Sequence, residues 1–202
     1  GEEGEILLED AQHLAAHNED RLGEHRYEEL AAAMRVLGVT DWRLLGAPHK
    51  YRDSGMMGTE SNNRDDCFWR ADLLEAASDL VAVIREVRPQ VAVTYDDFGG
   101  YGHPDHIQAH RVLMYAVALA AVPSFRLDLG EPWKVSKVYW TALPKGMLRD
   151  GIRALREAGE DTGFAAMDPD NLPIGTEDEL VTTSDDYHVL LDTKMEAFAQ
   201  HD

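Results

Sequence analysis

The densest group of reactive side chains in this sequence falls within ten residues. Tyr101, His103, Asp105 and His106 are followed, one helical turn later, by His110. Imidazole, carboxylate and phenol groups act as metal ligands and as general acids or bases. A metal-dependent hydrolase needs two or three protein ligands, an open position for water and a nearby acid or base. The segment therefore predicts part of a hydrolytic site, supplying one ligand and one acid or base.

The spacing of the histidines leaves the choice of ligand pair open. His106 and His110 have the i, i+4 spacing of a helical zinc pair, whereas His103 and His106 lie at the expected start of a helix. A third interpretation assigns them no chemistry, with Asp105 only a first-turn carboxylate favoured by the helix dipole. We favour a functional site because the whole cluster follows an apolar strand.

Regular elements on both sides are expected to position this cluster. Residues 73–87 have apolar side chains at helical spacing, and Pro89 ends the run. Residues 91–95 (VAVTY) form a near-continuous β-branched run, which is typical of a buried parallel strand. Residues 107–121 predict a second helix. Since ligands gather at the carboxyl ends of strands in open α/β sheets, this strand–loop–helix junction is where we expect the site.

The other segments complete an alternating pattern. We predict a helix over residues 11–37 with a break near Gly23, a long surface loop over residues 50–66 and a strand over residues 137–142. The last predicted helices cover residues 148–157 and 194–199. The order helix, strand, helix, strand predicts an α/β fold with a mostly parallel sheet and helices on both faces, forming a single domain over residues 1–202.

Composition excludes several classes of partner. The chain has 38 acidic and 19 basic side chains and a net charge of -19, so it would repel nucleic acid and anionic membranes. No apolar run approaches the roughly 18 residues of a membrane span. Cys67 is the only cysteine, which excludes an intrachain disulfide and a cysteine-rich zinc site. We expect a cytoplasmic protein with no nucleic-acid or membrane partner; the sequence carries no signal for an oligomeric state.

Three segments together resemble one enzyme family. GEEGE at residues 1–5, YRDSGM at 51–56 and GGYGHPDH at 99–106 are similar to the LmbE-like, or PIG-L, zinc-dependent N-deacetylases. The likeness is greatest to the branch that removes acetate from N-acetylglucosaminyl-inositol in mycothiol biosynthesis, and YRDSGM favours it over the mycothiol S-conjugate amidases. The resemblance implies a Rossmann-like fold and a small-molecule glycoside as substrate.

The resemblance also implies roles for the residues of the cluster. His106 would be a metal ligand, and His103 would act as the general acid with Asp105 orienting it. Tyr101 would help to stabilise the oxyanion. Zn²⁺ is the expected metal, although Fe²⁺ accepts the same histidine and aspartate ligands.

Four further residues would contact the substrate by the same resemblance. Arg26 and Asp53 would bind the sugar and inositol hydroxyls, with Glu5 and Met56 nearby. An Arg fork and a carboxylate suit the recognition of a polyol. Their pattern alone also allows surface pairing, since Arg26 lies on an acidic helix and Asp53 follows Arg52.

This sequence departs from the family at both ends. It lacks the His-Pro-Asp-Asp-Glu segment that supplies the family's other metal ligands and general base, and it lacks the family's C-terminal end. We therefore expect a truncated domain without its first strand–helix unit, inactive alone, whose parent protein is the enzyme. Two alternatives remain: a mycothiol S-conjugate amidase, and a non-catalytic sugar-binding module that has lost the metal site.

Overall fold

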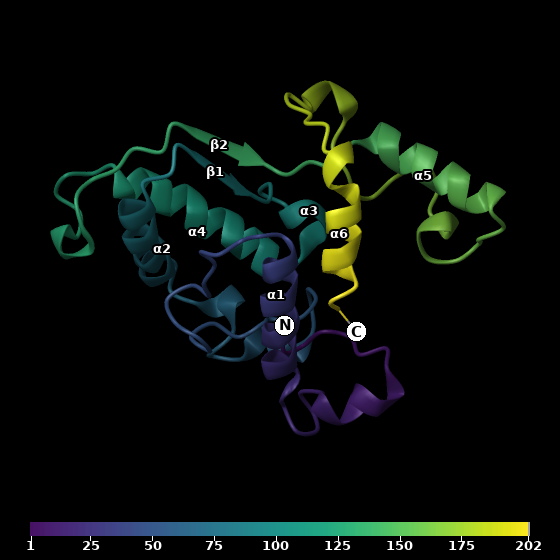
Figure 1. The fold of residues 1–202 in the computed structure, drawn as a ribbon, viewed down its shortest axis with the longest axis horizontal. Helices are drawn as coiled ribbons and strands as arrows, with labels where there is room; N and C mark the ends of the chain where they lie inside the picture. Colours follow the sequence, from purple (N-terminus) through teal and green to yellow (C-terminus); the bar gives the residue numbers. More distant parts are fainter. Residues whose placement is uncertain (202) are drawn as a thin grey trace.

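A two-stranded parallel sheet lies over two long helices in the computed structural model, which describes residues 1–201 (Figure 1). Strand β1 (Val91–Thr94) pairs with β2 (Lys137–Trp140), with Val91 opposite Lys137 and Thr94 opposite Trp140. Parallel strands need a crossover connection, and here it contains a long helix. The predicted α/β class and parallel sheet are confirmed.

Two helices form the layer beneath the sheet. Helix α2 (Leu73–Val87) begins where the Asp72 carboxylate accepts the Glu75 N–H at 2.8 Å. Helix α4 (Pro104–Ala120) belongs to the crossover between the strands and packs against α2. Both predicted helices are present, and the predicted start of α4 was three residues late because His103 and Pro104 already form its first turn.

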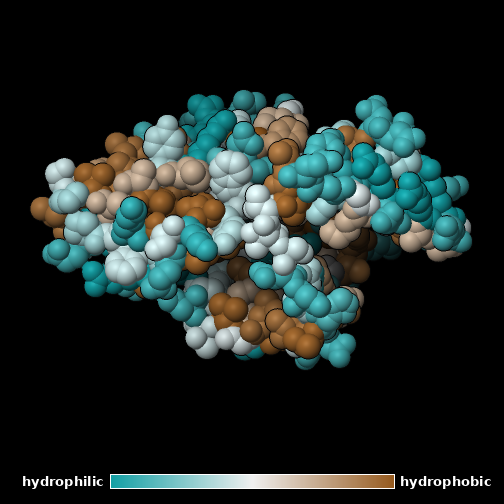
Figure 2. Space-filling view, turned by 90° about the horizontal axis from the view of Figure 1, so that it is seen from above, coloured by the Kyte–Doolittle hydropathy of each residue, from teal (hydrophilic) through white to brown (hydrophobic). Residues whose placement is uncertain are grey.

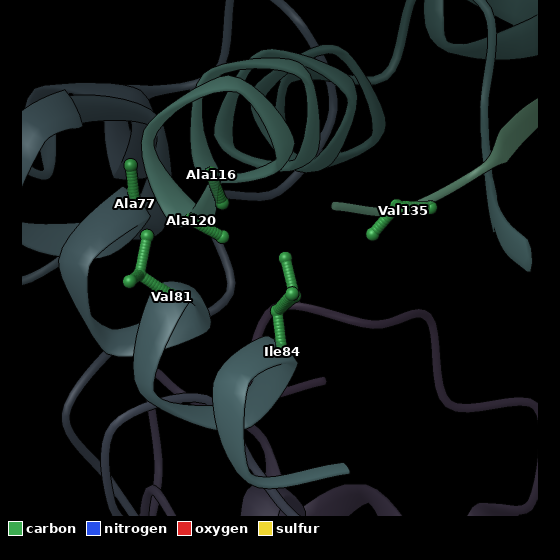
Figure 3. Packing of buried hydrophobic residues seen from close by; sticks show 6 residues of the cluster. All are labelled: Ala77, Val81, Ile84, Ala116, Ala120 and Val135. Atoms are coloured by element: carbon green, nitrogen blue, oxygen red, sulfur yellow. The ribbon is translucent and has the colours of Figure 1, made fainter. Parts of the chain in front are cut away.

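Small side chains allow α2 and α4 to approach closely. Ala77, Val81, Ala116 and Ala120 are fully buried between the helices (Figure 3). Val135, just before β2, closes the cluster from the sheet side. Interiors packed this densely resist displacement, so the two helices and the sheet form one rigid unit.

Arg85 of α2 binds the end of α4 without a carboxylate partner among the described residues. Its side chain is 4% exposed, and its guanidinium donates to the carbonyl oxygens of Leu119, Ala120 and Val122 at 3.1–3.4 Å. It also donates to Arg126 and Gly130 in the following loop, at 2.8 and 3.1 Å. Carbonyl oxygens at a helix end lack part of their intrahelical hydrogen bonding, and this one cation adds donors to several of them.

The remaining elements surround this unit. Helix α1 (Leu22–Val36) contacts α6 (Leu191–Phe198). Helix α5 (Lys145–Glu157) projects at the right of the view in Figure 1, on the side of the molecule away from α2. The short helix α3 (Gly99–Gly102) precedes α4. Short 3-10 helices cover Glu9–Leu14, Glu60–Asn63, Phe68–Arg70, Leu127–Leu129, Gly163–Ala166, Asp178–Leu180 and His188–Leu190.

The prediction for the first helix was partly wrong. Residues 9–14 form a 3-10 helix instead of the start of a long α-helix, and α1 begins only at Leu22. The break lies before Leu22, where Asp20 has a left-handed backbone (φ 54°), and Gly23 lies inside α1. Good helix formers did not extend the helix because propensity is a weak preference that turns and tertiary contacts override.

The prediction that β1 is buried on both faces was also wrong. Val91 and Val93 are 47% and 63% exposed, whereas Ala92 packs against the core. Within residues 1–201, α2 and α4 cover one face of the sheet, so helices on both faces are not observed. Seen from the sheet side, apolar side chains, in brown, reach the surface among polar ones (Figure 2).

Within residues 1–201, no helix combines the length and the apolar character needed to cross a membrane.

Replacing Arg85 with Met tests its role at the end of α4. Met keeps the apolar stem but removes five hydrogen bonds from a buried guanidinium to carbonyl oxygens, so the free energy of unfolding should fall by about 2 kcal/mol or more. Urea denaturation measures the change. Arg153→Met is the control, because Arg153 is exposed and pairs with exposed Asp150; it should change stability by less than about 0.5 kcal/mol. Equal losses in the two variants would contradict this role.

Candidate metal and catalytic centre

A sharp turn after β1 brings the chain into α4. The Asp96 carboxylate accepts the Gly100 N–H at 2.7 Å, and its carbonyl oxygen accepts the Gly99 N–H at 3.0 Å. Gly99 and Gly100 have φ angles of 68° and 77°, which L side chains rarely adopt. At the end of the turn, His103 Nδ1 accepts the Asp105 N–H at 3.1 Å, so His103 is the N-cap of α4.

His106 is held with one ring nitrogen available. Its Nδ1 lies 3.1 Å from the Gly99 carbonyl oxygen, and because a carbonyl only accepts, Nδ1 carries the proton and Nε2 carries the lone pair. Its ring stacks on Tyr95, with centroids 3.9 Å apart and planes within 4°. Burial lowers the pKa of His106, which favours the neutral imidazole. Metal-binding histidines typically have this arrangement.

His103 has the opposite tautomer. Since its Nδ1 accepts a hydrogen bond from Asp105, the proton of the neutral ring is on Nε2. Its ring lies 4.7 Å from that of His106 in a stacked arrangement. The ring of Tyr101 meets both imidazoles edge-on, at 6.1 Å from His103 and 5.2 Å from His106. The structure therefore brings Tyr101, His103 and His106 together.

Asp105 is anchored through one oxygen. Its Oδ2 accepts the Ser54 N–H at 2.9 Å, while its buried Oδ1 has no hydrogen-bond partner among the residues that the structure describes. Burial raises the pKa of Asp105, the hydroxyl and N–H of Ser54 act to lower it, and the charge of Asp53 raises it further. An unpartnered buried carboxylate oxygen is unusual and suits a cation or a donor supplied by a ligand.

Asp53 approaches the cluster from the loop before α2. Burial acts to raise the pKa of Asp53, but hydrogen bonds from the Gly55 and Glu3 N–H groups act to lower it, and its pKa lies below the usual range. One carboxylate oxygen each from Asp53 and Asp105 and one nitrogen of His103 lie within 4.8 Å of one another. These three residues could hold a metal ion; His106 is beside this group but not part of it.

A cavity of about 390 Å³ opens over these side chains. Its walls come from the segment before Asp53, from Phe68 and from the start of α4. The lining residues are Gly1, Leu44, Leu45, Ala47, His49, Tyr51, Arg52, Asp53, Phe68, His103, Asp105 and His106. The cavity is therefore the place where a small substrate would meet the histidines.

His110 lies apart from this group. Its Nδ1 donates to the Tyr95 carbonyl oxygen at 3.0 Å, and its ring packs edge-on against Trp140 at 5.1 Å. It does not line the cavity. Of the two histidine pairs that the spacing left open, the structure brings His103 and His106 together around the cavity.

The four predicted substrate contacts are placed unequally. Asp53 lines the cavity, whereas Arg26, Glu5 and Met56 do not. Arg26 Nη1 donates to both oxygens of buried Glu29, at 2.7 and 2.8 Å. Glu5 and Met56 are exposed. Apart from Asp53, these residues would have to reach the substrate from outside the cavity.

Sequence reasoning missed residues of the cavity wall. His49 and Phe68 lie outside the segments that carry the family resemblance, and nothing in their local pattern marks them. Ser54 lies inside YRDSGM and is fully buried, yet a serine in a polar loop carries no signal for burial by itself.

Gly99 tests how the turn positions His106. A Cβ there would lie 2.8 Å from His106 Cβ and 2.8 Å from the Ile107 nitrogen, so Gly99→Ala should displace the imidazole. Beyond the strain of a left-handed alanine, about 1–2 kcal/mol, we expect a further loss of about 1–3 kcal/mol and a roughly 10- to 100-fold weaker affinity for Zn²⁺ in the full-length gene product.

Gly38→Ala is the matched control, because Gly38 has nearly the same φ of 69° with no atom within 4 Å of the added Cβ. It should show the strain but keep the parent's affinity for Zn²⁺, measured by isothermal titration calorimetry. If both variants kept that affinity, the turn would not position His106.

Known proteins resemble this chain closely. The profile of the family described as PIG-L, GlcNAc-PI de-N-acetylase, matches residues 1–117. A relative from Catenulispora acidiphila, 1D-myo-inositol 2-acetamido-2-deoxy-alpha-D-glucopyranoside deacetylase 1, is 57% identical over 197 residues, which are 97% of this chain and 61% of that relative.

Two relatives with the corresponding deacetylase name come from Geodermatophilus obscurus and Kribbella flavida. The first is 58% identical over 187 residues, which are 92% of this chain and 64% of the relative. The second is 55% identical over an alignment of 214 positions, which covers 100% of this chain and 69% of the relative. The chain thus spans roughly three fifths to seven tenths of the length of these relatives, and it belongs to the PIG-L family of GlcNAc-PI de-N-acetylases.

Proposed function

We propose that the full-length gene product hydrolyses the acetamide of N-acetylglucosaminyl-inositol and releases acetate, a step of mycothiol biosynthesis. The observation that carries this proposal is the identity of 55–58% over at least 92% of the chain to relatives named for that substrate, 1D-myo-inositol 2-acetamido-2-deoxy-alpha-D-glucopyranoside. The cavity over His103, Asp105 and His106 supports it, because these are the groups that amide hydrolysis needs.

The side chains around the cavity suit a divalent metal ion. His106 has a lone pair on Nε2, and the neighbouring Asp53, His103 and Asp105 bring one ligand atom each within 4.8 Å of one another. We propose Zn²⁺, with Fe²⁺ as the alternative, and His106 as a ligand. When bound, such an ion polarises a carbonyl group and lowers the pKa of water.

His103 is the proton donor of the proposed reaction. In amide hydrolysis the oxygen of water bonds to the carbonyl carbon, the C–N bond breaks, and the leaving nitrogen takes a proton. The neutral His103 ring carries its proton on Nε2, so that nitrogen can donate a hydrogen bond to the substrate. As the general acid, His103 would act as the imidazolium and give its Nε2 proton to the leaving nitrogen. Asp105 orients His103 through the cap of α4, and Tyr101 stands beside both rings to stabilise the oxyanion.

Residues of the loop before α2 and of α1 would bind the substrate hydroxyls. Asp53 lines the cavity and its lowered pKa keeps it an acceptor, which suits sugar hydroxyls. Arg26, Glu5 and Met56 complete the proposed contacts by family resemblance. The net charge of -19 supports a protein that binds neither nucleic acid nor anionic membranes, and the single cysteine fits a reducing cytoplasm.

The proposed activity is tested by incubating the full-length gene product with N-acetylglucosaminyl-inositol and measuring the free amine. We expect turnover that a chelator abolishes and Zn²⁺ restores, because the ion is required for the attack of water. A larger kcat/KM on a bimane conjugate of mycothiol would instead identify an S-conjugate amidase. Glycan binding without turnover, unaffected by chelator, would identify a sugar-binding module.

The two histidines should separate chemistry from metal binding. His103→Ala should lower kcat by roughly 100-fold or more with Zn²⁺ content near that of the parent, because it removes a proton donor. His106→Ala should lower both, because it removes a ligand. Elemental analysis beside steady-state kinetics measures the two effects. Equal loss of metal in the two variants would reverse the assigned roles.

A further inference from the structure

Ser54 connects the cavity loop to the start of α4. It is fully buried, with a relative exposure of 0%. Its N–H donates to Asp105 Oδ2 at 2.9 Å, across 51 positions of sequence. Its hydroxyl oxygen accepts the Trp69 N–H at 2.8 Å. A buried polar residue with its groups satisfied in this way is fixed in position.

The loop holds Ser54 from the other side as well. The Ser54 carbonyl oxygen accepts the Ser61 hydroxyl at 2.8 Å and the Asn62 side-chain amide at 2.6 Å. The residue before it, Asp53, lines the cavity. A shift of Ser54 would therefore move both the loop carboxylate and the anchor of Asp105.

We propose that Ser54 is a positioning residue of the active centre, which fixes Asp105 against the loop and through it the orientation of His103. The inference rests on the proposed function. Asp105 occupies the first turn of α4, where its own N–H is bound by His103 Nδ1. That hydrogen bond comes from the backbone N–H of Asp105, so a shift of the first turn of α4 that follows loss of the Ser54 contact would disturb it and turn the His103 ring, which changes where Nε2–H points. Ser54 touches neither ring, so its effect on the reaction passes through Asp105.

The test is Ser54→Ala in the full-length gene product. It keeps the backbone N–H that binds Asp105 Oδ2 but removes the hydroxyl, which accepts the Trp69 N–H and also acts on the Asp105 carboxylate. We therefore expect kcat to fall roughly 10-fold or more while KM changes by less than about 3-fold. A double-mutant cycle with Asp105→Asn should be non-additive, with the double variant no slower than Asp105→Asn alone. If the kcat losses simply multiply, Ser54 does not act through Asp105 and the inference fails.

Ser61→Ala is the matched control. It removes a hydroxyl from the same loop, one that binds Ser54 but does not reach Asp105. It should lower the unfolding midpoint as Ser54→Ala does and leave kcat near that of the parent; an equal loss of kcat would show that loop order alone matters. Should Ser54→Ala not fold, Ser54→Cys, which retains a weak donor and acceptor, should give an intermediate kcat, and a parent-like kcat would overturn the inference.

The experiments can refute the proposed function and the role of Ser54 independently of each other. A parent protein without deacetylase activity would refute the function. A parent with full activity and an Ser54→Ala variant with unchanged kcat would refute only the role of Ser54.

Discussion

The close packing of α2 against α4 is the constraint on which the rest of the structure depends. Alanine side chains at the contact let the two helices approach closely, and Arg85 of α2 binds the carbonyl end of α4. Helix α4 is therefore fixed at the end opposite the cavity. Because a helix is rigid along its length, this packing also fixes the positions of His103, Asp105 and His106 relative to the sheet.

The loop before α2 is placed by a different kind of force. It has little regular structure, so its backbone groups must find partners one by one, and the buried ones are satisfied by side chains. Ser54 and Asp105 form the contact that joins this loop to α4. The cavity wall depends on a few polar contacts, whereas the helices depend on apolar packing; substitutions in the loop should therefore affect function more than global stability.

The sequence predicted best those elements whose signals are local. Helix α2 has the predicted bounds because apolar periodicity and Pro89 both indicate the same segment. The run of residues 11–21 failed because good helix formers there yield to turns around Asp20. The burial of β1 failed because β-branched residues indicate a strand but not how many of its faces are covered.

The site divides in the same way. The cluster at the start of α4 could be predicted, since a strand, a glycine turn and a helix start are all visible in sequence. The approach of Asp53 to Asp105 was not derivable from pattern, because it joins residues 52 positions apart through an irregular loop; only the resemblance suggested that Asp53 belongs to the site. The tautomers of the histidines depend on backbone hydrogen bonds within the turn, which residue types do not specify.

The backbone of the turn gives His103 and His106 different tautomers although their side chains are identical. The Gly99 carbonyl oxygen places a proton on His106 Nδ1 and leaves Nε2 to bind a cation, whereas the Asp105 N–H takes the lone pair of His103 Nδ1 and leaves a proton on Nε2. The stacked rings, 4.7 Å apart, thus present a lone pair and an N–H group side by side. Exchanging the two tautomers would require a different backbone path between Gly99 and Asp105, so the turn, and not the residue type, sets which ring nitrogen carries the proton.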